Sequence, residues 1–295
     1  MYINRFLQVC SLLSRDSLLI KQAVYTIISI LTREIYFMKK IGKVFYWIIS
    51  IALKIFAVIA GVNLIFSYIG DRKRGPLPEN GKFYDWKFGR VFYRKRGYGA
   101  PVLLLHGFEP SHSSKDLESL SKYLADKHTV YSVDLLGFGF SDKPWITYTN
   151  FLYVQLIQDF IKNVIGEITD VVACDGSALT ALQAYHFDES RLGKIVLIDP
   201  CRSENLKAAK PFALKLKSVL DFPIFGTFLY NIYSLTGAAP FDKEGRHVFA
   251  SRLTGHLTSD IGKRPELLKP EIIVFGDPAK EPKTFTYGDI GTSLM

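Results

Sequence analysis

The stretch VDLLGFGFSDKP, residues 133–144, decides the fold of this chain. It begins with the apolar residues of a buried strand and continues into a glycine-rich loop that ends in Ser-Asp-Lys-Pro. Two other stretches have a related form. LLLHGF (103–108) predicts a strand that runs into His-Gly, and VVACDGSALTAL (171–182) predicts a strand, a tight polar turn and a helix. The three stretches indicate a sheet whose functional loops follow the ends of its strands.

Strands and helices alternate around these stretches from residue 82 onward. Residues 83–88 and 91–95 predict a hairpin. Further strands are expected at 102–105, 129–133, 170–173, 195–198 and 271–275, and helices at 115–126, 150–165 and 177–186. This alternation indicates an α/β fold, with a mostly parallel sheet and helices on both faces. Residues 202–265 interrupt it and are expected to form a helical lid insertion.

The hairpin and the three stretches resemble the α/β-hydrolase fold family. The resemblance covers residues 82–200 well and residues 201–277 loosely. The Gly-x-Gly-x-Ser-Asp-Lys-Pro piece looks most like that of haloalkane dehalogenases, epoxide hydrolases and related esterases. The resemblance implies an α/β-hydrolase-like sheet with a lid. We expect no cofactor and no metal, since the three cysteines have no zinc-site spacing.

Residues 44–69, VFYWIISIALKIFAVIAGVNLIFSYI, predict a transmembrane anchor that holds a single charge, Lys54. A span needs roughly 20 mostly apolar residues. Basic residues flank it on both sides, so the side of the membrane stays open. The shorter apolar stretch 17–31 is expected to lie on the interface or to add a marginal second span.

The complete division follows from these features. We expect an N-terminal extension (1–43), a transmembrane anchor (44–69), a linker (70–81), an α/β-hydrolase core (82–200), a lid or cap insertion (201–266) and a last core strand with a shortened C-terminus (267–295).

The basic charge belongs to the N-terminal quarter of the chain. The formal net charge is +9, but residues 1–74 carry +8 of it and residues 75–295 carry +1. A domain that reads phosphates should carry its positive charge on the folded part. The distribution therefore argues against a nucleic-acid partner, and it favours a membrane and a small neutral or apolar substrate.

The nucleophile is expected in the turn of residues 171–182, where the family places it on a strained strand-to-helix turn flanked by small residues. Ser177 has Asp175 and Leu179 at the two flanking positions. Asp175 has Ala173 and Ser177 there, and it matches the Asp nucleophile of dehalogenases and epoxide hydrolases. A third reading is that the turn only begins a helix, with one of them as its N-cap. All three stay open.

The resemblance also implies an oxyanion hole. Its backbone donors would come from the residue after the nucleophile, Ala178 if Ser177 attacks, and from the loop after His106-Gly107, where Phe108 is the expected donor. Gly107 belongs to the same substrate-binding loop. His106 matches the family's loop-shaping histidine and is not expected to be the base.

The acid of the triad is expected at Asp277, directly after the strand 271–276, with Glu281 and Asp199 as rivals. The family order then requires a histidine, but the 18 residues after Asp277 contain none. His247 and His256 remain, and both precede this strand. We therefore expect either a chain shortened at the C-terminus or a member that binds without turnover.

The function expected from the sequence is a membrane-anchored hydrolase of a small or lipid-like ester. One alternative is a catalytically impaired pseudo-hydrolase that acts as a membrane-tethered binding or scaffold protein. The other is an Asp-nucleophile dehalogenase or epoxide hydrolase, which depends on Asp175. The oligomeric state stays open.

Overall fold

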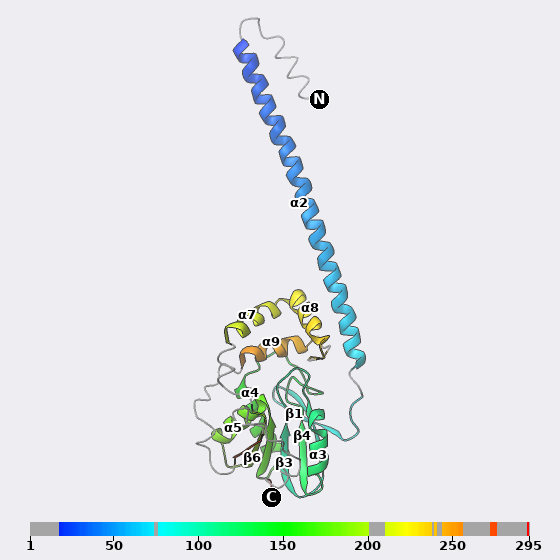
Figure 1. Cartoon of the computed structure of the whole chain (residues 1–295), viewed down its shortest axis with the longest axis vertical. Helices are drawn as coiled ribbons and strands as arrows, with labels where there is room; N and C mark the ends of the chain where they lie inside the picture. Colours follow the sequence, from blue (N-terminus) through cyan, green and yellow to red (C-terminus); the bar gives the residue numbers. More distant parts are fainter. Residues whose placement is uncertain are drawn as a thin grey trace. The chain divides into compact units, whose positions relative to one another are not determined.

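The computed structural model describes residues 18–73, 76–200, 210–237, 239–240, 244–255, 272–275 and 294 (Figure 1). The chain divides into two compact units, Met1–Val58 and Ile59–Met295. The predicted residues Asp277, Glu281 and His256 lie outside the described part of the chain.

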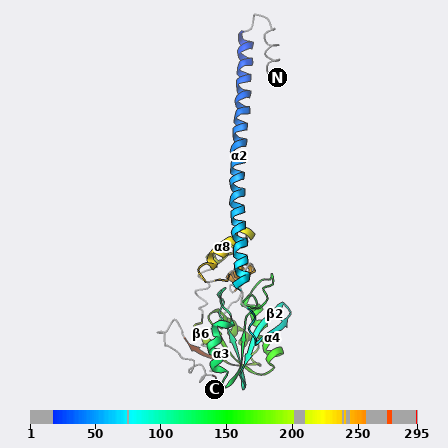
Figure 2. The same cartoon turned by 90° about the vertical axis from the view of Figure 1, so that its right-hand side faces the viewer.

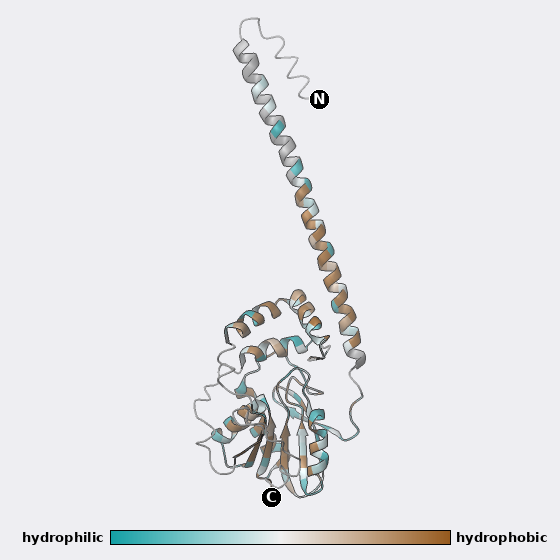
Figure 3. Ribbon diagram, viewed as in Figure 1, coloured by the Kyte–Doolittle hydropathy of each residue, from teal (hydrophilic) through white to brown (hydrophobic). Residues whose placement is uncertain are grey.

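One continuous helix, α2, runs from Leu18 to Lys73. Within it, Gly42–Gly70 is long and apolar enough to cross a membrane, by length and composition, and no residue of its most apolar window is buried. Figure 3 shows apolar residues concentrated in this part of the helix. The stretch 17–31 continues into the same helix from Leu18 onward, and the helix ends inside the expected linker.

A seven-stranded sheet forms the core, in the order β1-β2-β4-β3-β5-β6-β7. Its strands are β1 (Gly81–Trp86), β2 (Gly89–Arg96), β3 (Ala100–Leu105), β4 (His128–Val133), β5 (Thr169–Cys174), β6 (Leu192–Ile198) and β7 (Ile272–Phe275). The pairs β1–β2 and β2–β4 are antiparallel, and the other four pairs are parallel. The carboxyl ends of β3, β5 and β6 therefore meet at one edge, where parallel sheets carry their sites.

Helices cover both faces of the sheet, so each central strand is buried on both sides. Leu103 and Leu105 of β3 pack with residues of α4 (Asn150–Phe160) and α5 (Gly176–Phe187). Val102 and Leu104 pack with residues of α3 (Glu118–Leu124). The expected helix 150–165 changes after Phe160 into a π-helical turn, η2 (Ile161–Ile165). The α/β-hydrolase fold class is confirmed.

In its described residues the cap contains the helices α7 (Lys210–Leu220), α8 (Pro223–Ser234) and α9 (Gly245–Gly255). Figure 1 shows α9 between the core and the other two, and Figure 2 shows α8 above the strands of the core. The Tyr148 N–H donates to Ser251 Oγ at 2.7 Å, which ties α9 to the core. The cap and the core meet over the ends of the parallel strands.

Candidate active site

The turn between β5 and α5 is built around Asp175. This residue has φ 50° and ψ −127°, a backbone conformation that non-glycine residues rarely adopt. Its N–H donates to the Ile198 carbonyl oxygen at 2.9 Å. A Cβ at Gly176 would stand 2.7 Å from the Phe108 ring, so only glycine fits beside Asp175 without a shift. The turn thus places the Asp175 carboxylate at the strained strand-to-helix position.

Ser177 lies inside this turn and is 0% exposed. Its hydroxyl donates to the Cys174 carbonyl oxygen at 2.7 Å, and the Leu105 carbonyl oxygen is 3.2 Å away. Ser177 Oγ also accepts a hydrogen bond from the Cys174 N–H at 3.1 Å. The hydroxyl therefore links β5 to β3 below the turn. The Ala178 N–H donates to the Asp175 carbonyl oxygen at 3.1 Å, within the first turn of α5.

The loop after β3 lies directly against the Asp175 carboxylate. The Phe108 N–H donates to Asp175 Oδ2 at 3.4 Å. A Cβ at Gly107 would stand 3.0 Å from Asp175 Oδ2 and 2.5 Å from His112 Nδ1. The expected loop residues Gly107 and Phe108 are therefore brought to Asp175, and His112 is brought to the same point.

His106 holds this loop in place. Its Nδ1 lies 2.6 Å from the Gly107 carbonyl oxygen, and its Nε2 accepts from the Leu135 N–H at 3.0 Å. These contacts put the ring proton on Nδ1. Burial lowers the pKa of His106, so the ring stays neutral at physiological pH. Both nitrogens are thus occupied by the two loops that follow β3 and β4.

His112 is a site residue that the sequence did not indicate. Its Nδ1 is buried and has no hydrogen-bond partner among the described residues. Its Nε2 lies 4.0 Å from Glu109 Oε2. Of the described histidines, this is the one placed against Gly107 and Asp175. His247 stacks on Trp145 with its ring 3.8 Å away and bonds the Ile146 carbonyl oxygen.

Arg252 of α9 is a second site residue that the sequence did not indicate. Its guanidinium carbon lies 3.6 Å from the centre of the Phe108 ring and 5.1 Å from that of Tyr153. Its Nη1 donates to Asn150 Oδ1 at 3.4 Å. Burial lowers the pKa of Arg252, while Tyr153 and Asp175 favour the charged form. An arginine keeps its charge in proteins, so the site holds a buried cation near the Asp175 carboxylate.

The Gly-x-Gly-x-Ser-Asp-Lys-Pro loop is organised by Asp134. Its carboxylate accepts from the Ser114 N–H at 2.7 Å and from the Phe140 N–H at 2.8 Å. Gly139 has φ 47°, and a Cβ there would stand 2.0 Å from Asp134 Oδ2. Ser141 Oγ donates to the Asp134 carbonyl oxygen at 2.5 Å. The motif therefore shapes the rim of the site and does not carry the chemistry.

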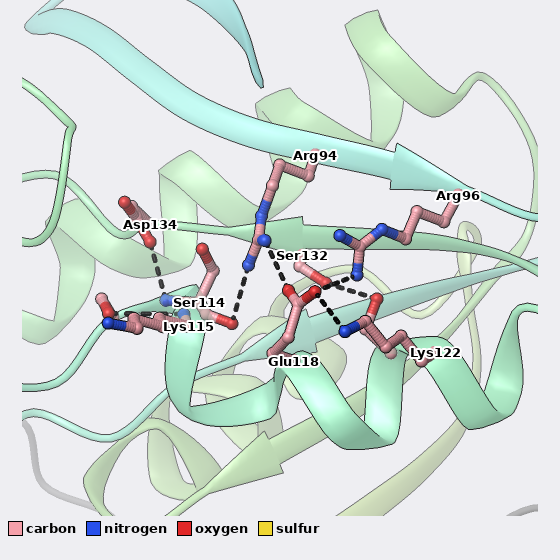
Figure 4. Close-up of polar contacts among 10 residues, drawn as sticks. Arg94, Arg96, Ser114, Lys115, Glu118, Lys122, Ser132 and Asp134 are labelled. Carbon is pink, nitrogen blue, oxygen red and sulfur yellow. Dashed lines mark hydrogen bonds and ion pairs between the residues drawn. The ribbon is translucent and has the colours of Figure 1, made fainter. Parts of the chain in front are cut away.

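A cluster of charged side chains from β2 and α3 holds the end of the loop after β3, at Ser114 (Figure 4). Glu118 pairs with Arg94, with Arg96 at 2.7 Å and with Lys122 at 3.4 Å. Arg94 Nη2 also donates to the Ser114 carbonyl oxygen at 3.2 Å. Burial pushes the pKa of Glu118 upward, but the hydrogen bonds and charges of Arg96 and Arg94 outweigh it and lower that pKa.

A small apolar cavity lies between the cap and the loops of the core. Its volume is about 10 Å³ for the centres of water-sized spheres, room for about one water molecule. It is lined by Phe108, Pro110, Gly137, Phe138, Lys143, Tyr230, Pro240, Gly245, Val248, Phe249 and Arg252. A larger groove, of about 590 Å³, lies outside the glycine-rich loop and includes neither Asp175 nor Arg252.

Asp199 stands at the end of β6, exposed, with φ 45°. Its N–H donates to the Phe275 carbonyl oxygen at 2.9 Å. Cys174, the last residue of β5, is partly buried. Burial first, and then the charges of Asp199 and Asp175, raise the pKa of Cys174 to about 12. In the part of the chain that the structure describes, no cluster of three or more His, Cys, Asp or Glu residues could hold a metal ion.

A family model described as "Alpha/beta hydrolase family" matches residues 102–279. This chain belongs to the alpha/beta hydrolase family. The match of the hydrolase model takes in the three diagnostic stretches, the Asp175 turn and the cap. A crystal structure of an alpha/beta hydrolase fold protein from Burkholderia ambifaria aligns with a TM-score of 0.50 at 19% identity, covering 61% of this chain and 73% of that one. That likeness shows the fold alone.

Curated relatives of this chain match over shorter regions. The mesoderm-specific transcript protein of Mus musculus is 30% identical over 133 residues, 42% of this chain. A 2-hydroxy-6-oxo-6-(2'-aminophenyl)hexa-2,4-dienoic acid hydrolase of Metapseudomonas resinovorans is 35% identical over 89 residues, 29% of this chain. The chain spans 39% of the length of the first relative and 31% of the second.

Proposed function

We propose that this protein is a membrane-anchored hydrolase in which the Asp175 carboxylate attacks an electrophilic carbon of a small, apolar substrate. The observation that carries the proposal is the backbone of Asp175, φ 50° and ψ −127°, at the turn between β5 and α5. Hydrolases of this fold present their nucleophile on such a strained turn. Ser177, the other candidate, is fully buried with its hydroxyl bonded below the turn.

The reaction has two steps. In the first, an Asp175 oxygen forms a bond to the substrate carbon while the bond from that carbon to its leaving group breaks, so the negative charge moves to the leaving group. In the second, a water oxygen attacks the carbonyl carbon of the new ester and the alcohol product departs. The proton that the water loses is taken up by a base, and the water oxygen stays in the regenerated Asp175 carboxylate.

Two groups beside Asp175 match the charges that form in these steps. The buried Arg252 cation supports the negative leaving group of the first step, because electrostatic stabilisation is strong in a site that excludes water. The Phe108 N–H, 3.4 Å from Asp175 Oδ2 in the resting site, supports the oxyanion of the second step. Both groups are in place before substrate enters.

His112 is the described residue best placed to take the proton from the attacking water. Its Nδ1 lies next to Gly107. A Cβ at Gly107 would be 2.5 Å from this nitrogen and 3.0 Å from Asp175 Oδ2. That nitrogen is buried, and the described residues offer it no hydrogen bond. An imidazole nitrogen without a hydrogen bond can accept a proton from a water molecule placed next to it, which is the role of a general base.

The substrate class follows from the lining of the cavity. Phe108, Phe138 and Val248 supply apolar surface, and Lys143 and Arg252 are the charged residues of the lining. The Asp175 carboxylate, which lies outside the lining, favours the charged form of Arg252. The cap must open to admit a substrate, because the cavity has room for about one water molecule. A neutral, apolar molecule with an electrophilic alkyl carbon, such as an epoxide or an alkyl halide, suits this lining better than a polyanion. A hydrolase among the curated relatives supports hydrolytic chemistry in general.

The apolar part of α2, Gly42–Gly70, supports the anchor. A membrane would also concentrate apolar substrates near the site. We therefore place the protein in a membrane as a single-pass protein, and we propose no nucleic-acid partner.

The test is isotope incorporation into Asp175. The full-length protein in detergent or nanodiscs is given styrene oxide, 1-bromohexane or p-nitrophenyl butyrate in water enriched in ¹⁸O, and the peptide that contains Asp175 is weighed after several turnovers. We expect heavy oxygen in the Asp175 carboxylate with an alkyl substrate. Asp175→Asn should form no alkyl ester at residue 175 and should lose at least about 100-fold in rate.

The outcome against the proposal is turnover without label in Asp175, or label that is lost in Ser177→Ala. Folded protein that binds these compounds but turns none of them over would instead support a binding protein of the hydrolase fold. Ser111→Ala, an exposed loop serine, is the control for nonspecific effects.

A further inference from the structure

Residues 59–73 of α2 belong to the same unit as the cap. Asn63 Nδ2 donates to the Ile224 carbonyl oxygen of α8 at 3.0 Å. Asn231 Nδ2, also on α8, donates to Asn63 Oδ1 at 3.0 Å. Asn63 lies inside the apolar segment Gly42–Gly70, so part of the candidate span makes polar contacts with the cap.

These contacts fix the position of α8 relative to Gly70, the end of the apolar segment. Asn63 precedes Gly70, the end of the apolar segment, by about 10 Å along the helix axis, at about 1.5 Å per residue. If Gly42–Gly70 crosses a bilayer, α8 must reach a similar distance below that end in order to contact Asn63. Amphipathic helices that lie in a membrane interface are immersed by about 5–10 Å.

The outer surface of α7 and α8 has the composition of such a helix pair. No charged residue occurs in α8. Its segment exposes Phe222 at 69%, and the neighbouring exposed apolar side chains are Phe212, Leu214, Val219, Phe225, Ile232 and Leu235. An apolar group of this kind on both outer cap helices marks an interaction site with a protein or a membrane. The Asn63 contacts decide between these two.

We propose that the outer face of α7 and α8 lies in the lipid interface, with Phe222 and Phe225 inserted among the acyl chains. This inference depends on the proposed anchor, because it is the span that brings lipid to the level of Asn63. Pairing with Asn231 and Ile224 also satisfies the Asn63 amide, which would be costly to leave unpaired in hydrocarbon. The cap then opens toward the membrane, where an apolar substrate is dissolved.

The experiment uses full-length protein in phosphatidylcholine nanodiscs, with the native Cys10, Cys174 and Cys201 replaced by serine. One cysteine is then introduced at a time and labelled with the environment-sensitive fluorophore NBD. Phe225→Cys probes α8, Phe56→Cys probes the middle of the span, and Phe187→Cys on α5 is the exposed control from the core. Emission wavelength and quenching by nitroxide-bearing lipids are measured for each.

The expected result is blue-shifted, lipid-quenched emission at residues 56 and 225 and water-like emission at residue 187. Lipid-quenched emission at 56 with water-like emission at 225 would overturn the cap inference and leave the anchor standing. Blue-shifted emission at 225 that lipid nitroxides do not quench would also overturn it, because a protein partner would then cover the face. Water-like emission at 56 would overturn the anchor and the cap inference together.

A second variant tests the contact itself. Asn63→Leu keeps the span apolar but removes both hydrogen bonds to α8. We expect quenching at residue 225 to fall at least about twofold while quenching at residue 56 is unchanged. Unchanged quenching at both positions would contradict the role given to Asn63.

Discussion

The guanidinium of Arg252 stacks on the ring of Phe108, with 3.6 Å between the guanidinium carbon and the ring centre. Arg252 belongs to the cap helix α9, and Phe108 belongs to the loop whose N–H contacts Asp175. This contact connects the cap to the loop that holds the Asp175 carboxylate. The packing of the cap on the core and the charge near Asp175 therefore depend on the same pair of residues.

Replacing Arg252 should slow the chemical step more than it destabilises the fold. Arg252→Met removes the cation beside the leaving group, and we expect kcat to fall by about 100-fold. Arg252→Lys keeps the charge and should retain part of the rate. Single-turnover kinetics with the substrate found by the isotope experiment measure this effect.

Arg246→Met is the matched control, because Arg246 is also buried in α9 but packs near Trp145 and bonds the Leu220 carbonyl oxygen. It should lower the melting temperature with little change in kcat. An equal loss of kcat in both variants would reduce Arg252 to a structural role.

Ser177 should behave as a structural residue. A fluorophosphonate probe should not label the folded protein, since the Ser177 hydroxyl is 0% exposed and bonded to the backbone. Ser177→Ala should destabilise the protein by about 2 kcal/mol, because it removes the bond to the Cys174 carbonyl oxygen and the bond from the Cys174 N–H. Urea unfolding measures this cost. Strong labelling that disappears in Ser177→Ala would restore serine chemistry at this site.

The Glu118 cluster should make stability depend on acid pH. The pKa of Glu118 is lower in the folded chain than in the unfolded chain. Its contribution is therefore present above the unfolded pKa, about 4.3, and is lost as pH falls through the folded pKa. Glu118→Gln should cost about 2 kcal/mol at neutral pH and flatten the acid limb of a melting-temperature profile. Asp126→Asn, an exposed substitution nearby, should leave that limb unchanged.

His106 should add a second pH dependence at higher pH. Burial lowers the pKa of His106 in the folded state, so the unfolded chain binds the proton first as pH falls. Stability is then complete above about pH 6.5 and decreases below it by up to about 1.4 kcal/mol per pH unit. His106→Gln should reduce this slope and leave the part that comes from His247, whose pKa burial also lowers. His186→Gln, which changes an exposed histidine, should keep the whole slope. Denaturant midpoints between pH 5 and pH 8 decide the matter.

Much of the core could be read from local pattern. The apolar runs around Val102–Leu105 and Val171–Ala173 identify central strands because those strands are buried on both faces. The glycine-rich loop after Asp134 could be recognised as a family feature, but its purpose could not. Gly139 is required by its contact with the Asp134 carboxylate and Gly137 by its contacts with Tyr148 and Val248, and such contacts are visible only in three dimensions.

The site was harder to predict, for physical reasons. Ser177 and Asp175 are two residues apart, and spacing alone does not tell which one has the strained φ. His112 and Arg252 belong to no motif. They reach Asp175 because a loop folds back over Gly107 and because a cap helix closes on Phe108. Periodicity describes neither event.

The strained turn has an evolutionary consequence. It is held by the Asp175 N–H on Ile198, by the Ala178 N–H on the Asp175 carbonyl oxygen and by the Ser177 hydroxyl, and none of these bonds uses the Asp175 carboxylate. The scaffold is thus independent of the group it displays. A serine or cysteine at position 175 would be held on the same strained turn beside Phe108. A single substitution would then replace the carboxylate with a nucleophile suited to acyl transfer.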